Sequence, residues 1–338
     1  MRYAIVAFAA IFALTARGPV YAQDGIDTDY VMTNGINFHY AHKGDGEMVI
    51  FLHGYPAFWY MWKDQIADIG EDYFAVAPDM RGYNLSTIPP AQEQYQAKYL
   101  IEDVKKFAEA VGGDKAKKFV LVGHDWGGLV AWMYAMHHPE TLSKLVIVNA
   151  PHPDIFEREM RENPVQRAGS SYMFAFNNYD GYNWAEQMGK DGYKGFAQGI
   201  LGSTLRAGNY TQEDVDKWIE SWKIPRALDA GLDYYRANHL NPPFNDQHPA
   251  ETIPTSWSAD AVLKGAKTRV IETPTLIIWG TNDSALQSGN LSGIEKFVPN
   301  STFKFYPTDH WVPMTHPKEV SRDIREFISG ESQSANAE

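Results

Sequence analysis

Short apolar runs alternate with longer segments of helical periodicity along most of the chain. The runs predict strands over residues 30–33, 37–42, 48–52, 73–77, 119–122, 144–148, 275–279 and 303–306. The later runs are almost continuous Val, Ile and Leu, which is typical of strands buried on both faces of a parallel sheet. Helical spacing of apolar residues predicts helices over residues 96–110, 128–137 and 318–328. The pattern therefore predicts an α/β fold with a mostly parallel, eight-stranded sheet and helices on both faces.

Residues 152–266 interrupt this alternation. The segment is rich in aromatic residues, Asn and Gly, and it has helical spacing without a strand-like run. Because the sheet pattern resumes at Thr275, we interpret the segment as a helical cap inserted after the sixth strand. The cap divides the core into residues 23–151 and 267–330, and residues 331–338 form a polar tail.

The first 22 residues have the pattern of a secretory signal peptide. Arg2 precedes an apolar run over residues 4–14, and Val20-Tyr21-Ala22 resembles a cleavage site. The run is shorter than the roughly 18 apolar residues that a membrane anchor needs, and no later segment approaches that length. We therefore expect a soluble protein without a membrane span, exported to the periplasm or the extracellular space.

Composition excludes several classes of function. The 338 residues are 44% hydrophobic and 14% aromatic, which is enough to bury a large core. The net charge of −12 argues against nucleic acid as a partner, because binding a polyanion requires a basic surface. The chain has no cysteine, so disulfides and thiol chemistry are excluded. No phosphate loop, dinucleotide fingerprint or metal-ligand spacing occurs, so we expect neither a cofactor nor a metal.

An acidic residue stands where the fifth predicted strand turns into a helix. Gly123-x-Asp125-x-Gly127 has the spacing of a nucleophile elbow, a strained turn that exposes one side chain and needs small neighbours. At this position the N–H groups and dipole of the following helix favour an ionised carboxylate. Taken alone, the same residues also suit a loop whose aspartate simply caps the helix.

Three further features in chain order favour the elbow. His53-Gly54-Tyr55-Pro56 follows the third strand, where the N–H of Tyr55 is expected to complete an oxyanion hole with that of Trp126. Asp283 follows the strand over residues 275–279, and His310 follows the last strand. Nucleophile, acid and histidine in this order are expected of an α/β-hydrolase triad. We also place His53, Pro56 and Trp126 at the substrate.

At these motifs the sequence resembles the epoxide hydrolase branch of the α/β-hydrolase superfamily. The resemblance rests on HGYP, GHDWGG, the NAPHP after the sixth strand, the Asp of WGTND and the His of DHW, and it extends over residues 30–328. It implies an α/β-hydrolase fold with an inserted helical cap, in which Asp125 is the nucleophile, His310 the base and Asp283 its orienting acid. The implied partners are a small-molecule epoxide and water.

The chemistry of a carboxylate agrees with this resemblance. A carboxylate that attacks a saturated carbon forms an ester, which water activated by a histidine can cleave. Asp125 therefore indicates C–O opening of an epoxide or C–halogen cleavage. In relatives that open epoxides, two cap tyrosines protonate the oxygen; the resemblance assigns these roles to Tyr172 and Tyr235, with Tyr234 as a competitor for the second.

Two alternatives remain from the sequence. A haloalkane or haloacid dehalogenase uses the same aspartate nucleophile, and Trp126 suits halide binding. However, Tyr55 stands where haloalkane enzymes usually have Asn, and the Arg that follows the nucleophile in haloacetate enzymes is missing. The second alternative is a non-catalytic ligand-binding or effector protein on a hydrolase scaffold, which the complete set of catalytic motifs argues against.

Overall fold

A computed structural model describes residues 25–177, 183–244, 250 and 256–330. The expected signal peptide and the polar tail therefore lie outside the described residues. Within the described part of the chain, no helix has the length and apolar character needed to cross a bilayer.

Eight strands of the described chain form one mostly parallel sheet in the order β1-β2-β4-β3-β5-β6-β7-β8. Strand β2 is antiparallel to both of its neighbours, and the remaining pairs are parallel. The strands are β1 Asp27–Thr33, β2 Ile36–Lys43, β3 Met48–Leu52, β4 Phe74–Pro78, β5 Phe119–His124, β6 Leu142–Val148, β7 Thr275–Gly280 and β8 Ser301–Tyr306. Each overlaps a predicted strand, so the predicted fold class is confirmed.

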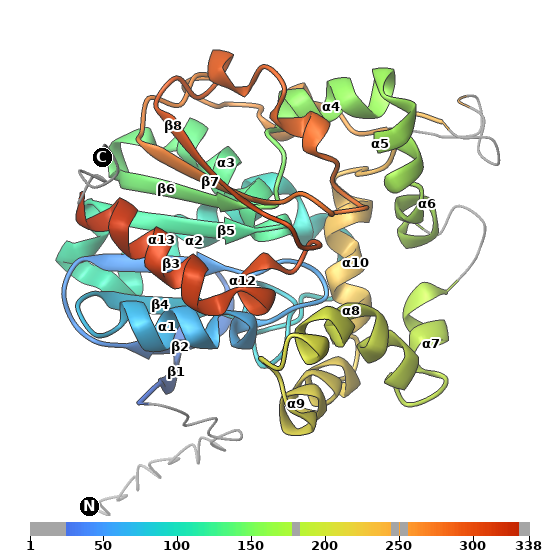
Figure 1. Ribbon diagram of the computed structural model, residues 1–338, viewed down its shortest axis with the longest axis horizontal. Helices are drawn as coiled ribbons and strands as arrows, with labels where there is room; N and C mark the ends of the chain where they lie inside the picture. Colours follow the sequence, from blue (N-terminus) through green and yellow to red (C-terminus); the bar gives the residue numbers. More distant parts are fainter. Residues whose placement is uncertain (1–24, 178–182, 245–249, 251–255, 331–338) are drawn as a thin grey trace, which may run out of the picture.

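The central strands β3, β5 and β7 are buried along their whole length. Their β-branched and other apolar residues meet helices on both faces of the sheet, which explains why their sequences are continuous apolar runs rather than alternating ones. In Figure 1, α1 and α13 lie in front of the sheet and α2 and α3 lie behind it. The core helices are α1 Lys63–Ile69, α2 Ala97–Gly112, α3 Trp126–His137, α12 Val312–Thr315 and α13 Pro317–Ser329.

A group of helices is inserted between β6 and β7 and forms the cap. These helices gather on one side of the sheet, at the right of Figure 1. Several begin at residues suited to a helix start: Pro153 is the first residue of α4, and Thr211 and Asp214 form a capping box at α9. The cap helices are α4 Pro153–Glu162, α5 Pro164–Gly169, α6 Tyr172–Phe176, α7 Trp184–Gly189, α8 Lys194–Arg206, α9 Gln212–Lys223, α10 Ala227–Ala237 and α11 Ala259–Val262.

Helix α10 joins the cap to the core. The hydroxyl of Tyr234 donates to the carbonyl of Arg81 at 2.8 Å. At the end of α10, the amide of Asn238 donates to the carbonyl of Tyr95 and accepts from the N–H of Ala97. These buried bonds satisfy backbone groups of the core with side chains of the cap, so α10 is fixed to the sheet domain.

Candidate active site

Asp125 occupies the turn between β5 and α3. Its backbone has φ 52° and ψ −122°, a conformation that costs a non-glycine residue about 1–3 kcal/mol and that is common at functional sites. Gly127 makes the turn possible, because a Cβ at this position would lie 2.3 Å from the carbonyl oxygen of Leu52. The strained backbone therefore lies at the residue that carries the carboxylate, and the lack of a side chain at Gly127 lets the turn form.

Two backbone N–H groups hold the Asp125 carboxylate. The N–H of Tyr55 donates to Oδ1 at 2.8 Å, and the N–H of Trp126 also donates to this carboxyl group. These are the two donors that the sequence predicts for an oxyanion hole. Because both already point at the carboxyl group, they are placed to stabilise negative charge that develops there.

His53 supports this loop from behind. Its Nδ1 is 2.9 Å from the carbonyl oxygen of Gly54, and its Nε2 accepts from the N–H of Met80 at 2.9 Å. Burial lowers the pKa of His53 to about 4, so the ring is neutral. The side chain is fully buried and does not reach the described cavities. His53 thus fixes the backbone beside Asp125. Of the two residues of this loop that were expected at the substrate, Pro56 lines the main cavity and His53 does not.

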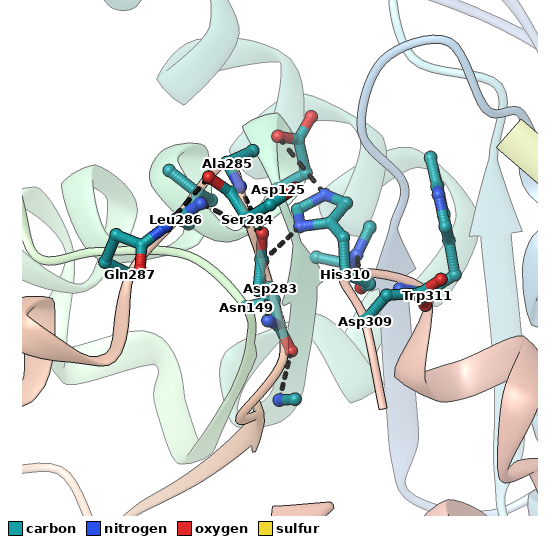
Figure 2. A network of polar contacts seen from close by, with 12 residues as sticks. Asp125, Asn149, Asp283, Ser284, Ala285, Leu286, Gln287, Asp309, His310 and Trp311 are labelled. Atoms are coloured by element: carbon teal, nitrogen blue, oxygen red, sulfur yellow. Dashed lines mark hydrogen bonds and ion pairs between the residues drawn. The ribbon is translucent and has the colours of Figure 1, made fainter. Parts of the chain in front are cut away.

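His310 lies between two carboxylates, as Figure 2 shows. Its Nδ1 is 2.7 Å from Oδ2 of Asp283, and its Nε2 is 3.6 Å from Oδ2 of Asp125. Asp283 is held in turn by the N–H groups of Ala285 and Leu286, both at 2.9 Å from Oδ1. The structure therefore brings together all three residues of the predicted triad.

Asn149 is a site residue whose role was not evident from the sequence. Its side-chain NH₂ group donates to Oδ2 of Asp283 at 2.7 Å, and its side-chain oxygen Oδ1 accepts from the N–H of Gly280 at 2.9 Å. It thereby connects the acid to the end of β7. The NAPHP motif contains this residue, but an Asn after a strand has many structural uses, so the motif did not reveal its partner.

Burial and the charges in the site together shift the pKa values of all three triad residues. Burial raises the pKa of Asp125, an effect that His310 and the two N–H donors only partly oppose. Burial also acts on Asp283, but there the charge and hydrogen bond of His310, with the N–H of Leu286 and the amide of Asn149, lower the pKa. Burial would lower the pKa of His310, yet Asp283 and then Asp125 raise it to about 9. The resting site therefore holds an imidazolium between two carboxylates.

The two predicted cap tyrosines face Asp125 across one cavity. Tyr172 at the start of α6 and Tyr235 in α10 line the same space as Asp125 and are hydrogen-bonded to each other. Burial, followed by the negative charge of Asp125, raises the pKa of both hydroxyls, so they remain protonated at neutral pH. Tyr234 instead points to the core, where its hydroxyl donates a hydrogen bond to the backbone carbonyl of Arg81. Geometry thus favours Tyr235 over Tyr234.

The main cavity has a volume of about 270 Å³. Besides Asp125, His310 and the tyrosines, its wall includes the aromatic side chains Phe176, Trp184, Phe196 and Trp311. The sequence indicated an aromatic-rich cap but not which rings reach the cavity, because that depends on how the cap helices pack. An apolar cavity with few convergent polar groups is typical of a small-molecule site.

Trp126 lies on the other side of the tyrosines. Its indole N–H is buried and has no hydrogen-bond partner among the described residues, and its ring meets Tyr234 and Tyr235 edge-on. Within the same residues, no group of three or more His, Asp or Glu side chains is arranged to hold a metal ion.

Known proteins resemble this chain over most of its length. A family model described as the alpha/beta hydrolase fold matches residues 47–317. Epoxide hydrolase 1 of Caenorhabditis elegans is 32% identical over 90% of this chain and 71% of that protein. The AB hydrolase superfamily protein YfhM of Bacillus subtilis is 33% identical over 91% of this chain and 100% of that protein. The crystal structure of Bacillus megaterium epoxide hydrolase with an inhibitor has a TM-score of 0.77 and 32% identity, covering 89% of this chain and 100% of that chain.

Proposed function

The protein belongs to the α/β-hydrolase family and is epoxide hydrolase-like, and on that premise we propose that it hydrolyses an epoxide to a vicinal diol through an ester on Asp125. One observation carries the proposal. Across a single cavity, a carboxylate next to a carboxylate-paired histidine faces two protonated tyrosine hydroxyls. A nucleophile, a base and a pair of acids are the groups that two-step opening of an epoxide requires.

In the first step, Asp125 attacks a ring carbon. Its Oδ1 is held by the N–H of Tyr55, which leaves Oδ2 to form the new C–O bond. The bond between that carbon and the ring oxygen breaks, and the oxygen takes a proton from Tyr172 or Tyr235. The tyrosine regains its proton from solvent. No atom of the substrate leaves, so the enzyme carries the whole epoxide as a hydroxyalkyl ester.

In the second step, water cleaves this ester. His310, oriented by Asp283, takes a proton from water through Nε2, and the water oxygen attacks Cγ of Asp125. Negative charge then develops on Oδ1, where the N–H groups of Tyr55 and Trp126 stabilise it. As the intermediate collapses, the bond between Cγ and the substrate oxygen breaks, and that oxygen takes the proton from His310, which releases the diol. The remaining proton of the water is lost from the carboxyl group of Asp125 to solvent, which restores the carboxylate and balances the proton that the tyrosine took up.

The two steps are separated by the variant His310→Gln, because alkylation needs no base. Incubated with styrene oxide, this variant is expected to gain the full mass of the epoxide, and peptide mapping should place the adduct on the peptide that contains Asp125. The double variant Asp125→Asn, His310→Gln is the matched control and should gain nothing. An adduct on another residue, or turnover by the native protein without any adduct in His310→Gln, would exclude the mechanism.

The indole N–H of Trp126 has no hydrogen-bond partner within the described part of the chain. This favours haloalkane cleavage as a second candidate activity, because a departing halide needs N–H donors. The same experiment distinguishes the two activities. A haloalkane leaves an adduct that lacks the halogen, whereas an epoxide leaves its full mass. Trapping by 1-chlorobutane or 1-bromobutane but not by epoxides would assign the protein as a dehalogenase.

We also propose that the protein is exported. The support is the N-terminal sequence alone, with Arg2, the apolar run over residues 4–14 and the site ending at Ala22. Sequencing the N-terminus of the mature protein tests the proposal. A mature chain that begins at Gln23 is expected, and one that retains residues 1–22 would contradict it.

A further inference from the structure

The loop that carries an oxyanion donor is held from the cap as well as from the core. The N–H of Ala57 donates to the carbonyl of Gly54 at 2.9 Å, which closes a turn around the two residues between them. Trp222 of α9 donates its indole N–H to the carbonyl of Pro56 at 2.7 Å. Proline has no N–H, so this carbonyl is the only backbone group of Pro56 that can form a hydrogen bond. The cap therefore holds the residue next to Tyr55.

The position of this indole N–H is itself well determined. Trp222 is 3% exposed, and the centroid of its ring lies 4.6 Å from that of Phe196 and 5.8 Å from that of Trp218. Near the start of α9, Oδ1 of Asp214 accepts from the hydroxyl of Tyr60 at 2.7 Å. Tyr60 belongs to the core segment that follows the loop. Because α9 is bonded to this segment near its start and carries Trp222 near its end, the helix and the loop are fixed relative to each other.

The N–H of Tyr55 contributes differently to the two proposed steps. In the first step the carboxylate of Asp125 loses its negative charge, so this donor is not bound more strongly in the transition state. In the second step negative charge returns to Oδ1, which accepts from the same N–H at 2.8 Å in the resting site. An oxyanion donor is effective only at hydrogen-bond distance from the atom that becomes charged. Accurate placement of Tyr55 therefore matters for ester hydrolysis and much less for alkylation.

We propose that Trp222 is a positioning residue of the oxyanion hole, because its hold on the carbonyl of Pro56 places the N–H of Tyr55. The cap thus supports the hydrolysis step through a side chain that does not line the main cavity. Phe196 packs against Trp222 and does line this cavity, so the cavity wall and the oxyanion loop share one support. The inference rests on the proposed epoxide hydrolase activity and adds a residue to its second step.

The test compares variants in which the ring at residue 222 either lacks or keeps an N–H. Trp222→Phe retains a ring that can pack but has no donor. Trp222→His loses the larger ring but keeps a donor, because Nε2 of histidine takes the place that Nε1 has in the five-membered ring of tryptophan. Quench-flow mass spectrometry with styrene oxide measures the fraction of the protein that carries the ester. Its time course gives the rate constants of alkylation and hydrolysis separately.

In Trp222→Phe the hydrolysis rate should fall by about tenfold or more, within the limit of roughly 10²–10³-fold for complete loss of an oxyanion donor. Alkylation should stay close to the native rate. The ester then accumulates, so kcat and KM should fall together while kcat/KM changes little. Hydrolysis should be faster in Trp222→His than in Trp222→Phe, although the histidine packs less well. Replacement of Trp222 by 3-benzothienylalanine, which has the shape of tryptophan without the N–H, should slow hydrolysis as Trp222→Phe does.

Both rate constants are first-order, so they do not depend on how much of a preparation is folded. If the two steps slow equally in Trp222→Phe, or if both keep their native rates, the inference is overturned and the proposed function stands. If hydrolysis is as slow in Trp222→His as in Trp222→Phe, packing rather than the N–H is responsible, and the inference is again overturned. If the native protein opens no epoxide, the proposed function fails and the inference fails with it.

Discussion

The pKa of His310 should depend strongly on the charge of Asp125. In the resting site this pKa is raised to about 9, chiefly by Asp283 and then by Asp125, whose Oδ2 lies 3.6 Å from Nε2. Formation of the ester removes the negative charge of Asp125. The variant Asp125→Asn removes the same charge while it keeps the shape of the side chain, so it reproduces the electrostatic state of the intermediate.

The magnitude follows from the distance. An opposite charge within 4–6 Å shifts a pKa by about 1–3 units, and two charges at 4 Å interact by about 4 kcal/mol at an effective dielectric constant of 20. With about 1.4 kcal/mol per unit, both figures predict that the pKa of His310 falls from about 9 to about 6–8 in Asp125→Asn. This decrease matters for turnover. Two pH units below its pKa, only about one histidine in a hundred is neutral and able to act as a base.

Histidine NMR measures the pKa directly. The chain has 11 histidines, and the signal missing from His310→Gln identifies the relevant one. Asp309→Asn is the control, because Asp309 makes the smallest of the named contributions. When ester hydrolysis limits turnover, kcat should fall in acid with the lower pKa of the intermediate. A native pKa at or below 6.5, or an Asp125→Asn value equal to the native one, would refute the reasoning.

Three further predictions concern named side chains. Tyr172→Phe and Tyr235→Phe should each slow adduct formation in a stopped-flow assay, and in the double variant the rate of adduct formation should fall by about 10²–10⁴-fold. The control Tyr234→Phe loses only the bond to the core and should form the adduct at the native rate. An equal decrease in the control would contradict the assignment. Asn149→Ala should lower the free energy of unfolding, measured in urea, by about 1–3 kcal/mol and should reduce kcat. The reason is that Asp283 and the N–H of Gly280 each lose a buried hydrogen-bond partner. Unchanged stability and an unchanged rate would contradict this prediction. Gly127→Ala should destabilise the protein by at least about 1–3 kcal/mol, because the new Cβ would lie 2.3 Å from a carbonyl oxygen; native-like urea unfolding would show that the turn relaxes.

The sequence predicted the positions of the strands, and the three residues predicted for the triad lie together in the structure; the reason is geometric. Parallel strands end at one edge of a sheet, so side chains that follow successive strands converge there even when they are far apart in sequence. Asp125, Asp283 and His310 follow β5, β7 and β8 in this way. The spacing of the motifs along the chain therefore predicts where these residues lie on the backbone. Because the loops after β5, β7 and β8 lie at the same edge of the sheet, their side chains are close enough to contact one another.

Side-chain direction was less predictable. The HGYP motif placed His53 beside the cavity, but the ring turns toward the backbone of Gly54 and Met80. Similarly, successive residues of a helix point about 100° apart, so Tyr234 and Tyr235 necessarily face different surroundings. Which of them faces the cavity depends on the rotation of α10 against the core, and that rotation is set by contacts distant in sequence, such as the bond from Tyr234 to Arg81.

The attachment of α10 bears on whether the cap is a separable module. The backbone carbonyl of Arg81 accepts a hydrogen bond from the hydroxyl of Tyr234, and the guanidinium of Arg81 forms a buried ion pair with Asp103 of α2. Asn238 likewise accepts a hydrogen bond from the N–H of Ala97 at the start of α2. Removal of the insertion would therefore leave backbone groups of the sheet domain without their hydrogen-bond partners, in addition to exposing the cavity to solvent. In evolution, shortening or exchanging this cap must either retain α10 or replace the contacts it makes with the core.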